Sequence, residues 1–178
     1  MEIYFITSNR HKLAEANHAL GTKLKHKNLE IPEMQSTEVK EVAVEKARSA
    51  YEAAGHEVVV EDTGVYIKQL NGFPGALAKW FLKSLGGEAI CRLLDNYEDR
   101  SAYMETCVVA YDGKETHIFC GRLKGSIAKK PRGTNGFGYD SIFVPAGKNT
   151  TLAEMDISEK SRISARGMAF KKLKKYLA

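Results

Sequence analysis

The chain has 178 residues, of which 43% are hydrophobic and 28% are charged, and its formal net charge is +5. This length suits one domain, and the hydrophobic content excludes a disordered or fibrous protein. No run approaches the roughly 18 apolar residues that cross a bilayer, and the first residues include an early acid and no cleavage site. We therefore expect one soluble, unexported domain.

The positive charge is concentrated at the C-terminal end. Residues 159–178 contain seven Lys or Arg residues and one Glu, a sum of +6, so the preceding residues sum to −1. A basic segment permits binding to nucleic acid. Lys171–Lys175 also suits the solvated face of a helix, and we favour this interpretation.

The three cysteines are Cys91, Cys107 and Cys120, and none belongs to a CxxC motif. An odd number of widely spaced cysteines supports neither a disulfide framework nor a zinc site. We therefore expect a protein of the reducing cytoplasm.

The first half of the chain predicts two strands, each followed or preceded by a helix. Residues 2–7 are β-branched and aromatic and predict a buried strand, and Lys12–Leu20 predicts a helix that stops at Gly21. A second helix is expected over Thr37–Ala54, where apolar residues recur with helical spacing. The next strand, Val58–Val60, is expected to end at two acids, and strand ends of open α/β sheets present ligands.

The second half predicts a broken helix, a long β-hairpin and a terminal helix. Combined with the first half, this order predicts one α/β domain over residues 1–178, with a long mixed sheet flanked by helices. The expected segments are a turn at 71–75, a helix over 77–94 broken at Gly86-Gly87, strands over 102–111 and 116–128 joined at Asp112-Gly113, a glycine-rich loop over 129–140, a strand over 141–144 and a helix over 161–177.

The segment Thr7-Ser-Asn-Arg-His-Lys12 lies between the first strand and helix. Small polar groups and free N–H groups at a helix N-terminus suit a polyphosphate, and Lys12 adds a positive charge. Alternatively, Thr7, Ser8 or Asn9 only caps the helix, because the segment lacks the glycines of a Walker sequence.

Three acids, Glu33, Glu61 and Asp62, are candidate ligands for Mg²⁺, which prefers oxygen donors and needs only one or two carboxylates beside a phosphate. Adjacent residues of an extended chain point to opposite faces, so we expect only one of Glu61 and Asp62 to enter a site. Surface carboxylates in a turn are the alternative.

A third group of candidates lies late in the chain. Phe137 lies among three glycines, which let a ligand approach the backbone while the ring offers a stacking face to a planar base. Lys160, Ser164 and Arg166, near the start of the last helix, offer donors to base carbonyls or phosphates. A flexible loop and solvated charges are the alternatives.

Six segments in chain order together resemble the inosine triphosphate pyrophosphatases, also called non-canonical purine NTP or XTP/dITP pyrophosphatases. The resemblance runs nearly from end to end, and the ordered set is far more specific than any one motif. The segments are Thr7-Ser-Asn-Arg-His-Lys12 (family T-G-N-x-x-K, here with Ser8), Ile31-Pro-Glu-Met-Gln35 (P-E-x-Q), Val60-Glu-Asp-Thr-Gly64 (E-D-[ST]-G), Gly72-Phe-Pro-Gly75 (G-x-P-G), Gly136-Phe-Gly-Tyr-Asp140 (G-F-G-[YW]-D), and Glu154-Met155 with Glu159-Lys160 (A-E-M, then E-K).

The resemblance implies an elongated α/β homodimer that uses Mg²⁺ to cleave a nucleoside triphosphate between its α and β phosphates, yielding a monophosphate and pyrophosphate. We expect no nucleic-acid or membrane partner. The site residues that it implies are Asp62 as proton acceptor, Glu33 and Asp62 for the metal, Thr7, Ser8, Asn9, Arg10, His11, Lys12 and Lys46 for the phosphates, Thr63 as a further substrate contact, and Phe137, Gly138, Tyr139, Asp140, Lys160, Ala165 and Arg166 around the base.

One departure concerns the base. The family has S-H-R where this chain has Ser164-Ala165-Arg166, and alanine cannot donate a hydrogen bond. A pyrophosphatase with a different or broader base preference is therefore the enzymatic alternative. A nucleic-acid-binding module that uses the basic last helix is the alternative from another class, but it leaves the acids and the loop at Thr7 unexplained.

Overall fold

The computed structural model describes residues 4–178, whose strands assemble into one mixed sheet with helices on both faces. The strands are β1 (Tyr4–Ile6), β2 (Lys25–Lys27), β3 (Val58–Ile67), β4 (Pro74–Gly75), β5 (Ser101–Tyr111), β6 (Thr116–Ile127) and β7 (Phe143–Pro145). The helices are α1 (Arg10–Leu20), α2 (Val39–Ala54), α3 (Ala78–Leu85), α4 (Gly87–Arg92), α5 (Ile157–Ile163) and α6 (Ala165–Leu177), with short 3-10 turns at Lys68–Leu70, Gly138–Ser141 and Leu152–Glu154.

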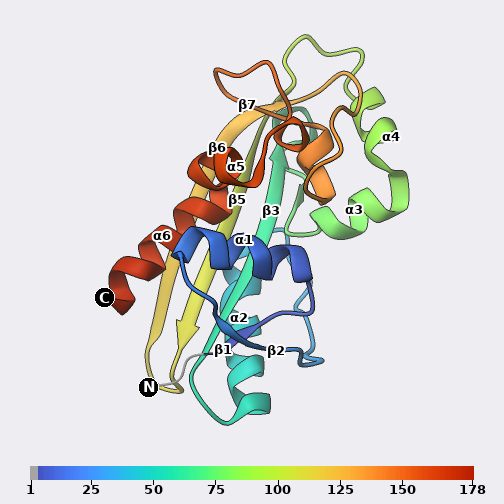
Figure 1. Ribbon diagram of the computed structural model, residues 1–178. Helices are drawn as coiled ribbons and strands as arrows, with labels where there is room; N and C mark the ends of the chain where they lie inside the picture. Colours follow the sequence, from blue (N-terminus) through green and yellow to red (C-terminus); the bar gives the residue numbers. More distant parts are fainter. Residues whose placement is uncertain (1–3) are drawn as a thin grey trace.

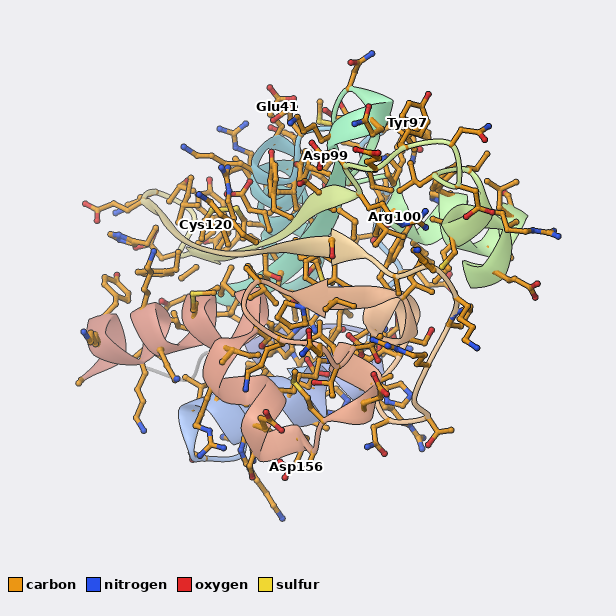
Figure 2. All side chains as sticks on the ribbon, turned by 90° about the horizontal axis from the view of Figure 1, so that it is seen from above. Glu41, Tyr97, Asp99, Arg100, Cys120 and Asp156 are labelled. Carbon is orange, nitrogen blue, oxygen red and sulfur yellow. A yellow bond between two sulfur atoms is a disulfide. The ribbon has the colours of Figure 1, made fainter. Side chains whose placement is uncertain are left out.

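The seven strands lie in the order β2-β1-β3-β5-β6-β7, and β4 pairs with β3. β1 runs parallel to β2 and β3, whereas β3, β5, β6 and β7 pair in antiparallel fashion. Figure 1 shows that β3, β5 and β6 span most of an elongated molecule, with α3 and α4 beside the upper end of β3. In the view from above in Figure 2, α1, α5 and α6 lie on one side of the sheet and α2 on the other. The expected α/β fold with a long mixed sheet is confirmed.

Local sequence explains where the first two helices begin and end. The Asn9 side chain caps the first turn of α1, and Gly21, at φ 71°, ends the helix in the left-handed conformation that glycine tolerates best. Gly55 ends α2 in the same way. The buried face of α2 is made of small apolar side chains, which let it pack closely on β3 and β5; they are Val39, Val42, Ala43, Ala47 and Ala50.

The pairing of β3 leaves a gap that positions the site. β1 pairs with β3 only up to Val59, and β4 pairs with it only from Val65. Within residues 4–178, the stretch between these positions therefore has a strand partner on its β5 side alone. Because the chain that leaves β1 turns into α1 beside this open stretch, the middle of β3 meets the start of α1.

Several predicted boundaries are wrong. Residues 61–64 lie inside β3 and not after its end, because β5 pairs with β3 along its whole length. The expected helix over 161–177 is two helices, since Ser164 adopts an extended conformation between α5 and α6. The short strand β2 was not predicted, and the strand expected over 141–144 is shifted to Phe143–Pro145. Of the expected first strand, residues 2 and 3 lie outside the described part.

The expectation that the cysteines support no disulfide is also wrong. Cys107 and Cys120 form a disulfide between β5 and β6, where the two residues lie directly opposite each other with Cα atoms 4.2 Å apart. The hairpin that pairs Tyr111 with Thr116 sets this register, so counting back from the turn would have found the pair. Cys91 is a buried free cysteine.

The basic C-terminal segment is a solvated helix face, as predicted. Lys171, Lys172, Lys174 and Lys175 are exposed, whereas Leu173 is fully buried against the sheet. No helix among residues 4–178 combines the length and apolarity that a membrane span requires.

Candidate active site

A cleft of about 1130 Å³ opens beside the unpaired stretch of β3. Its walls come from the β1–α1 loop, the segment before α2, helix α3 and the glycine-rich loop after β6. Of the predicted site residues, His11, Lys160 and Ala165 do not line it. Those that do are Thr7, Ser8, Asn9, Arg10, Lys12, Glu33, Lys46, Asp62, Thr63, Phe137, Gly138, Tyr139, Asp140 and Arg166.

The β1–α1 loop both caps a helix and faces the cleft. The side-chain oxygen of Asn9 accepts hydrogen bonds from the backbone N–H groups of His11 and Lys12, at 3.0 and 3.2 Å. The Asn9 N–H group in turn donates to Thr7 Oγ1 at 3.1 Å. The capping alternative is therefore confirmed. Because the cap uses two N–H groups of the first turn, a phosphate bound here depends mainly on side chains such as Ser8 and Lys12.

The adjacent acids of β3 point to opposite faces of the sheet, as the alternation along a strand requires. Glu61, with 1% of its side chain exposed, lies 2.5 Å from Lys12 Nζ and 2.7 Å from Arg166 Nε. Asp62, with 17% exposed, lines the cleft with its Oδ1 atom 3.8 Å from Lys12 Nζ. Only Asp62 is open to a ligand, which confirms the prediction that one of the two acids enters the site.

Glu61 belongs to a continuous chain of buried ion pairs that joins α1, α5, α6 and β3. Lys160 Nζ lies 2.5 Å from both Asp140 Oδ2 and Glu15 Oε1. Arg166 donates to Glu15 Oε2 and to Glu61 Oε2, each at 2.7 Å. Each of these five side chains is at most 10% exposed. Since a buried charge without a partner is costly, every member depends on its neighbours.

A second ion pair lies on the other side of Asp62. Lys46 Nζ, on α2, is 2.8 Å from Glu33 Oε1. Burial alone would lower the pKa of Lys46, but the charges of Asp62 and Glu33 raise it. Burial would likewise raise the pKa of Glu33, but the hydrogen bond from Lys46 and the charges of Lys46, Lys79 and Lys12 lower it. Lys46 is therefore a protonated cation held between two carboxylates that face the cleft.

Glu61 and Asp62 also differ in basicity. Burial raises the pKa of Asp62 and outweighs the opposing charges of Lys12 and Lys46. Burial would also raise the pKa of Glu61, but the charges of Arg166 and Lys12 lower that pKa to about 2. Glu61 is thus a permanent counter-ion, whereas Asp62 is the stronger proton acceptor and the one that faces the cleft.

The glycine-rich loop shapes the opposite end of the cleft. Gly136 and Gly138, at φ 75° and 64°, flank Phe137, and a side chain at Gly136 would collide with the Asp140 carboxylate. That carboxylate accepts a hydrogen bond from the Phe137 N–H group at 2.7 Å. The Tyr139 hydroxyl donates to the Ala78 carbonyl at 3.1 Å and so anchors the loop to α3. A planar aromatic ring is therefore presented at this end.

The break between α5 and α6 positions Arg166. Ser164 Oγ accepts a hydrogen bond from the Gly167 N–H group at 3.0 Å and caps α6. A side chain at Gly167 would collide with the Ser161 carbonyl, so glycine permits the close turn. Ala165 is buried, so the position expected at the base does not face the cleft.

Sequence reasoning missed several residues of the site. Glu15 stands out in the sequence only as an acid on the buried face of α1. Lys79 and the half-exposed Trp80, on α3, line the cleft without belonging to any motif considered. Thr106, buried in β5, lies 2.8 Å from Thr63 through the hydroxyl oxygens and could be found only from strand register.

The acids of the cleft fit Mg²⁺ as a partial ligand set. Within residues 4–178, no cluster of three or more His, Cys, Asp or Glu residues could hold a metal ion alone. Glu33 and Asp62 both line the cleft and offer carboxylate oxygens beside Lys46. Mg²⁺ usually binds through one or two carboxylates and completes its coordination with water and substrate phosphates, so this donor set is suitable.

Comparisons with known proteins agree with this geometry. The chain is 40% identical over 177 residues to the dITP/XTP pyrophosphatase of Methanopyrus kandleri, covering 97% of this chain and 94% of the relative. It is 41% identical to the inosine triphosphate pyrophosphatase of Schizosaccharomyces pombe, covering 98% and 94%. The solved structure of a HAM1 protein from Coxiella burnetii matches with a TM-score of 0.84 and 30% identity, covering 99% of this chain and 98% of that one.

The model of the Ham1 family matches residues 3–176, and the resemblance seen in the motifs is thereby confirmed. The chain belongs to the Ham1 family.

Proposed function

We propose that the protein hydrolyses non-canonical purine nucleoside triphosphates, namely ITP, dITP and XTP, to the monophosphate and pyrophosphate. The observation that carries the proposal is the partly exposed carboxylate of Asp62, which lines the cleft together with Lys12 and Lys46 and lies 3.8 Å from Lys12 Nζ. The names of the relatives, dITP/XTP and inosine triphosphate pyrophosphatase, support the substrate class.

The triphosphate binds where positive charge gathers along the cleft. Lys12, Lys46 and Lys79 line this part and act together on the Glu33 carboxylate. Glu33 and Asp62 would hold Mg²⁺, which would neutralise negative charge on the phosphate oxygens and so reduce their repulsion of the attacking water. When the triphosphate binds, the Lys46 ammonium group leaves its ion pair with Glu33 and pairs with a phosphate oxygen.

Asp62 accepts a proton from the attacking water. Its raised pKa makes it a better general base than an exposed aspartate. The water oxygen forms a bond to the α-phosphorus while the bond from that phosphorus to the α–β bridging oxygen breaks. The bridging oxygen leaves with pyrophosphate, and Lys12, which is 3.8 Å from Asp62, stabilises negative charge near the reacting group.

The base lies against Phe137, in the pocket shaped by Gly138, Tyr139 and Asp140. Arg166 lines the cleft and Lys160 lies behind it, and the N–H groups of both already hold Glu15, Glu61 and Asp140 in place. Since Ala165 offers no donor, selection of a 6-keto purine rests on the loop backbone, and a broader base preference is the alternative within this function.

We also propose a homodimer and a cytoplasmic location. Support for the homodimer comes from large apolar side chains that remain exposed near α3, namely Phe73, Trp80 and Leu85, at 41%, 47% and 43%. Support for the location comes from the proposed substrates, which belong to the cellular nucleotide pool. Light scattering after gel filtration tests the dimer.

One experiment tests the reaction itself. The protein is incubated with ITP, XTP, dUTP, ATP or GTP in ¹⁸O-labelled water, with Mg²⁺ or with EDTA, and the products are separated by chromatography. We expect a monophosphate that carries the label, unlabelled pyrophosphate, and no turnover in EDTA. A diphosphate as the primary product would refute the proposed reaction, and label in pyrophosphate would refute attack at the α-phosphorus.

A further inference from the structure

The imidazole of His11 lies beside Phe137, the ring proposed to contact the base, and does not itself line the cleft. Its ring stacks on Phe137, with centroids 5.1 Å apart and planes inclined by 22°. The ring nitrogens of His11 have no hydrogen-bond or ion-pair partner among residues 4–178. Stacking on Phe137 is thus the interaction that this side chain makes, although the sequence motif predicts a phosphate contact.

Phe137 lines the cleft, whereas His11, which packs on its ring, does not. The hydrogen bond from its N–H group to Asp140 holds the Phe137 backbone, whereas its side chain can still turn among staggered rotamers. The orientation of the phenyl ring therefore depends on the side chains packed against it.

Those side chains differ in how firmly they are held. Lys160 Nζ and the Arg166 guanidinium lie 5.2 and 5.3 Å from the centre of the Phe137 ring. Both cations are bound to buried carboxylates, so they lie near the ring but cannot move with it. His11 is the aromatic neighbour of this ring, and its plane is inclined by only 22° to the phenyl ring.

We propose that His11 is a positioning residue for base recognition, which stacks on Phe137 and holds that ring flat against the purine base of the substrate. The inference rests on the proposed function, since it requires a substrate with both a planar base and a triphosphate. It predicts that an aromatic ring is needed at position 11, whereas a phosphate ligand would need a positive charge there.

The test compares His11→Ala, His11→Phe and His11→Lys, with His18→Ala as the control on an exposed histidine of the same helix. Steady-state kinetics with ITP give kcat and KM, and inhibition by tripolyphosphate, which has no base, reports the phosphate subsite alone. A melting temperature for each variant confirms folding.

We expect His11→Ala to raise KM for ITP by about two- to tenfold with kcat changed less than about twofold, as loss of one aromatic stack predicts. His11→Phe restores KM, His11→Lys does not, and the inhibition constant of tripolyphosphate stays constant throughout. Rescue by Lys and not by Phe, weaker inhibition by tripolyphosphate in His11→Ala, or an unchanged KM in that variant would each overturn the inference.

The same experiment distinguishes failure of the proposed function from failure of the positioning role. If the wild-type protein and His18→Ala both release no pyrophosphate from ITP, the proposed function is refuted and the positioning role with it. Normal turnover in both proteins, with no effect of the His11 substitutions, refutes the positioning role alone.

Discussion

Replacing Glu15 by glutamine tests whether the buried ion pairs hold the site together. The carboxylate of Glu15 receives a charged hydrogen bond from Lys160 at 2.5 Å and another from Arg166 at 2.7 Å. Glutamine keeps the shape, but its single carbonyl oxygen can accept from only one of these cations, and its amide N–H groups then face the other donor. Each cation retains a second carboxylate, Asp140 or Glu61, so neither becomes an isolated buried charge.

The expected cost follows from these contacts. A hydrogen bond to a charged group contributes about 1.5–3 kcal/mol, which is the cost of the bond that is lost, and the bond whose acceptor becomes neutral costs about 1 kcal/mol more. Glu15→Gln should thus lower the free energy of unfolding by about 3 kcal/mol. For a chain of this size the same change lowers the melting temperature by roughly 6–12 °C. Glu15→Ala, which also opens a gap, should cost about 3–5 kcal/mol.

Urea unfolding followed by circular dichroism measures these differences. The matched control is Glu159→Gln, because Glu159 pairs with Lys148 at 3.3 Å with both side chains partly exposed, and such a pair contributes at most about 1 kcal/mol. Either of two results would refute the idea that this network is buried and tightly coupled. One is a Glu15→Gln protein as stable as Glu159→Gln, and the other is a loss of stability in Glu15→Gln that high salt abolishes.

Three further predictions concern charge and specificity. Asp62→Asn should reduce kcat by at least about 10²-fold with the melting temperature retained, because it removes the proton acceptor; more than a tenth of the wild-type rate would contradict this role. Ala165→His should raise the ratio of kcat/KM for ITP to kcat/KM for ATP by between about two- and 150-fold if the imidazole reaches the base. An unchanged ratio in a folded variant would show that a donor at position 165 does not select the base. Because the pKa of Glu61 is lowered from 4.5 to about 2, its charge stabilises the fold above pH 4.5, and this contribution is lost as the pH falls towards 2. The stability difference between wild type and Glu61→Gln should therefore shrink by about 3 kcal/mol between pH 6 and pH 2, and a constant difference in acid titrations of unfolding would refute the lowered pKa.

The caps and the alternation along β3 are local properties, and the sequence predicts them well. Asn9 and Gly21 bound α1 because capping depends on side chains within one turn of the helix end. Glu61 and Asp62 face opposite sides because successive residues of any strand do so. For the same reason, the sequence alone predicts that a single acid of this pair enters the cleft.

The disulfide and the break at Ser164 depend partly on local sequence and partly on tertiary contacts. The hairpin register that joins Cys107 to Cys120 follows from the turn, but their spacing of 13 residues resembles no known cysteine motif. Residues 161–177 have the apolar period of one helix. Ser164 interrupts it because its side chain caps the next turn and Gly167 packs against the Ser161 carbonyl, a contact that periodicity does not reveal.

The sequence alone predicted the class of sheet, most helices, the motifs of the Ham1 family and most of the residues that line the cleft. Only the tertiary structure decided that Glu15 bridges Lys160 and Arg166, 145 and 151 residues away along the chain, and that His11 stacks on Phe137. The physical reason is that these contacts depend on how α1, α5 and α6 pack on one face of β3. Helix packing arises from many weak apolar contacts across the whole sheet, and no short stretch of sequence encodes it.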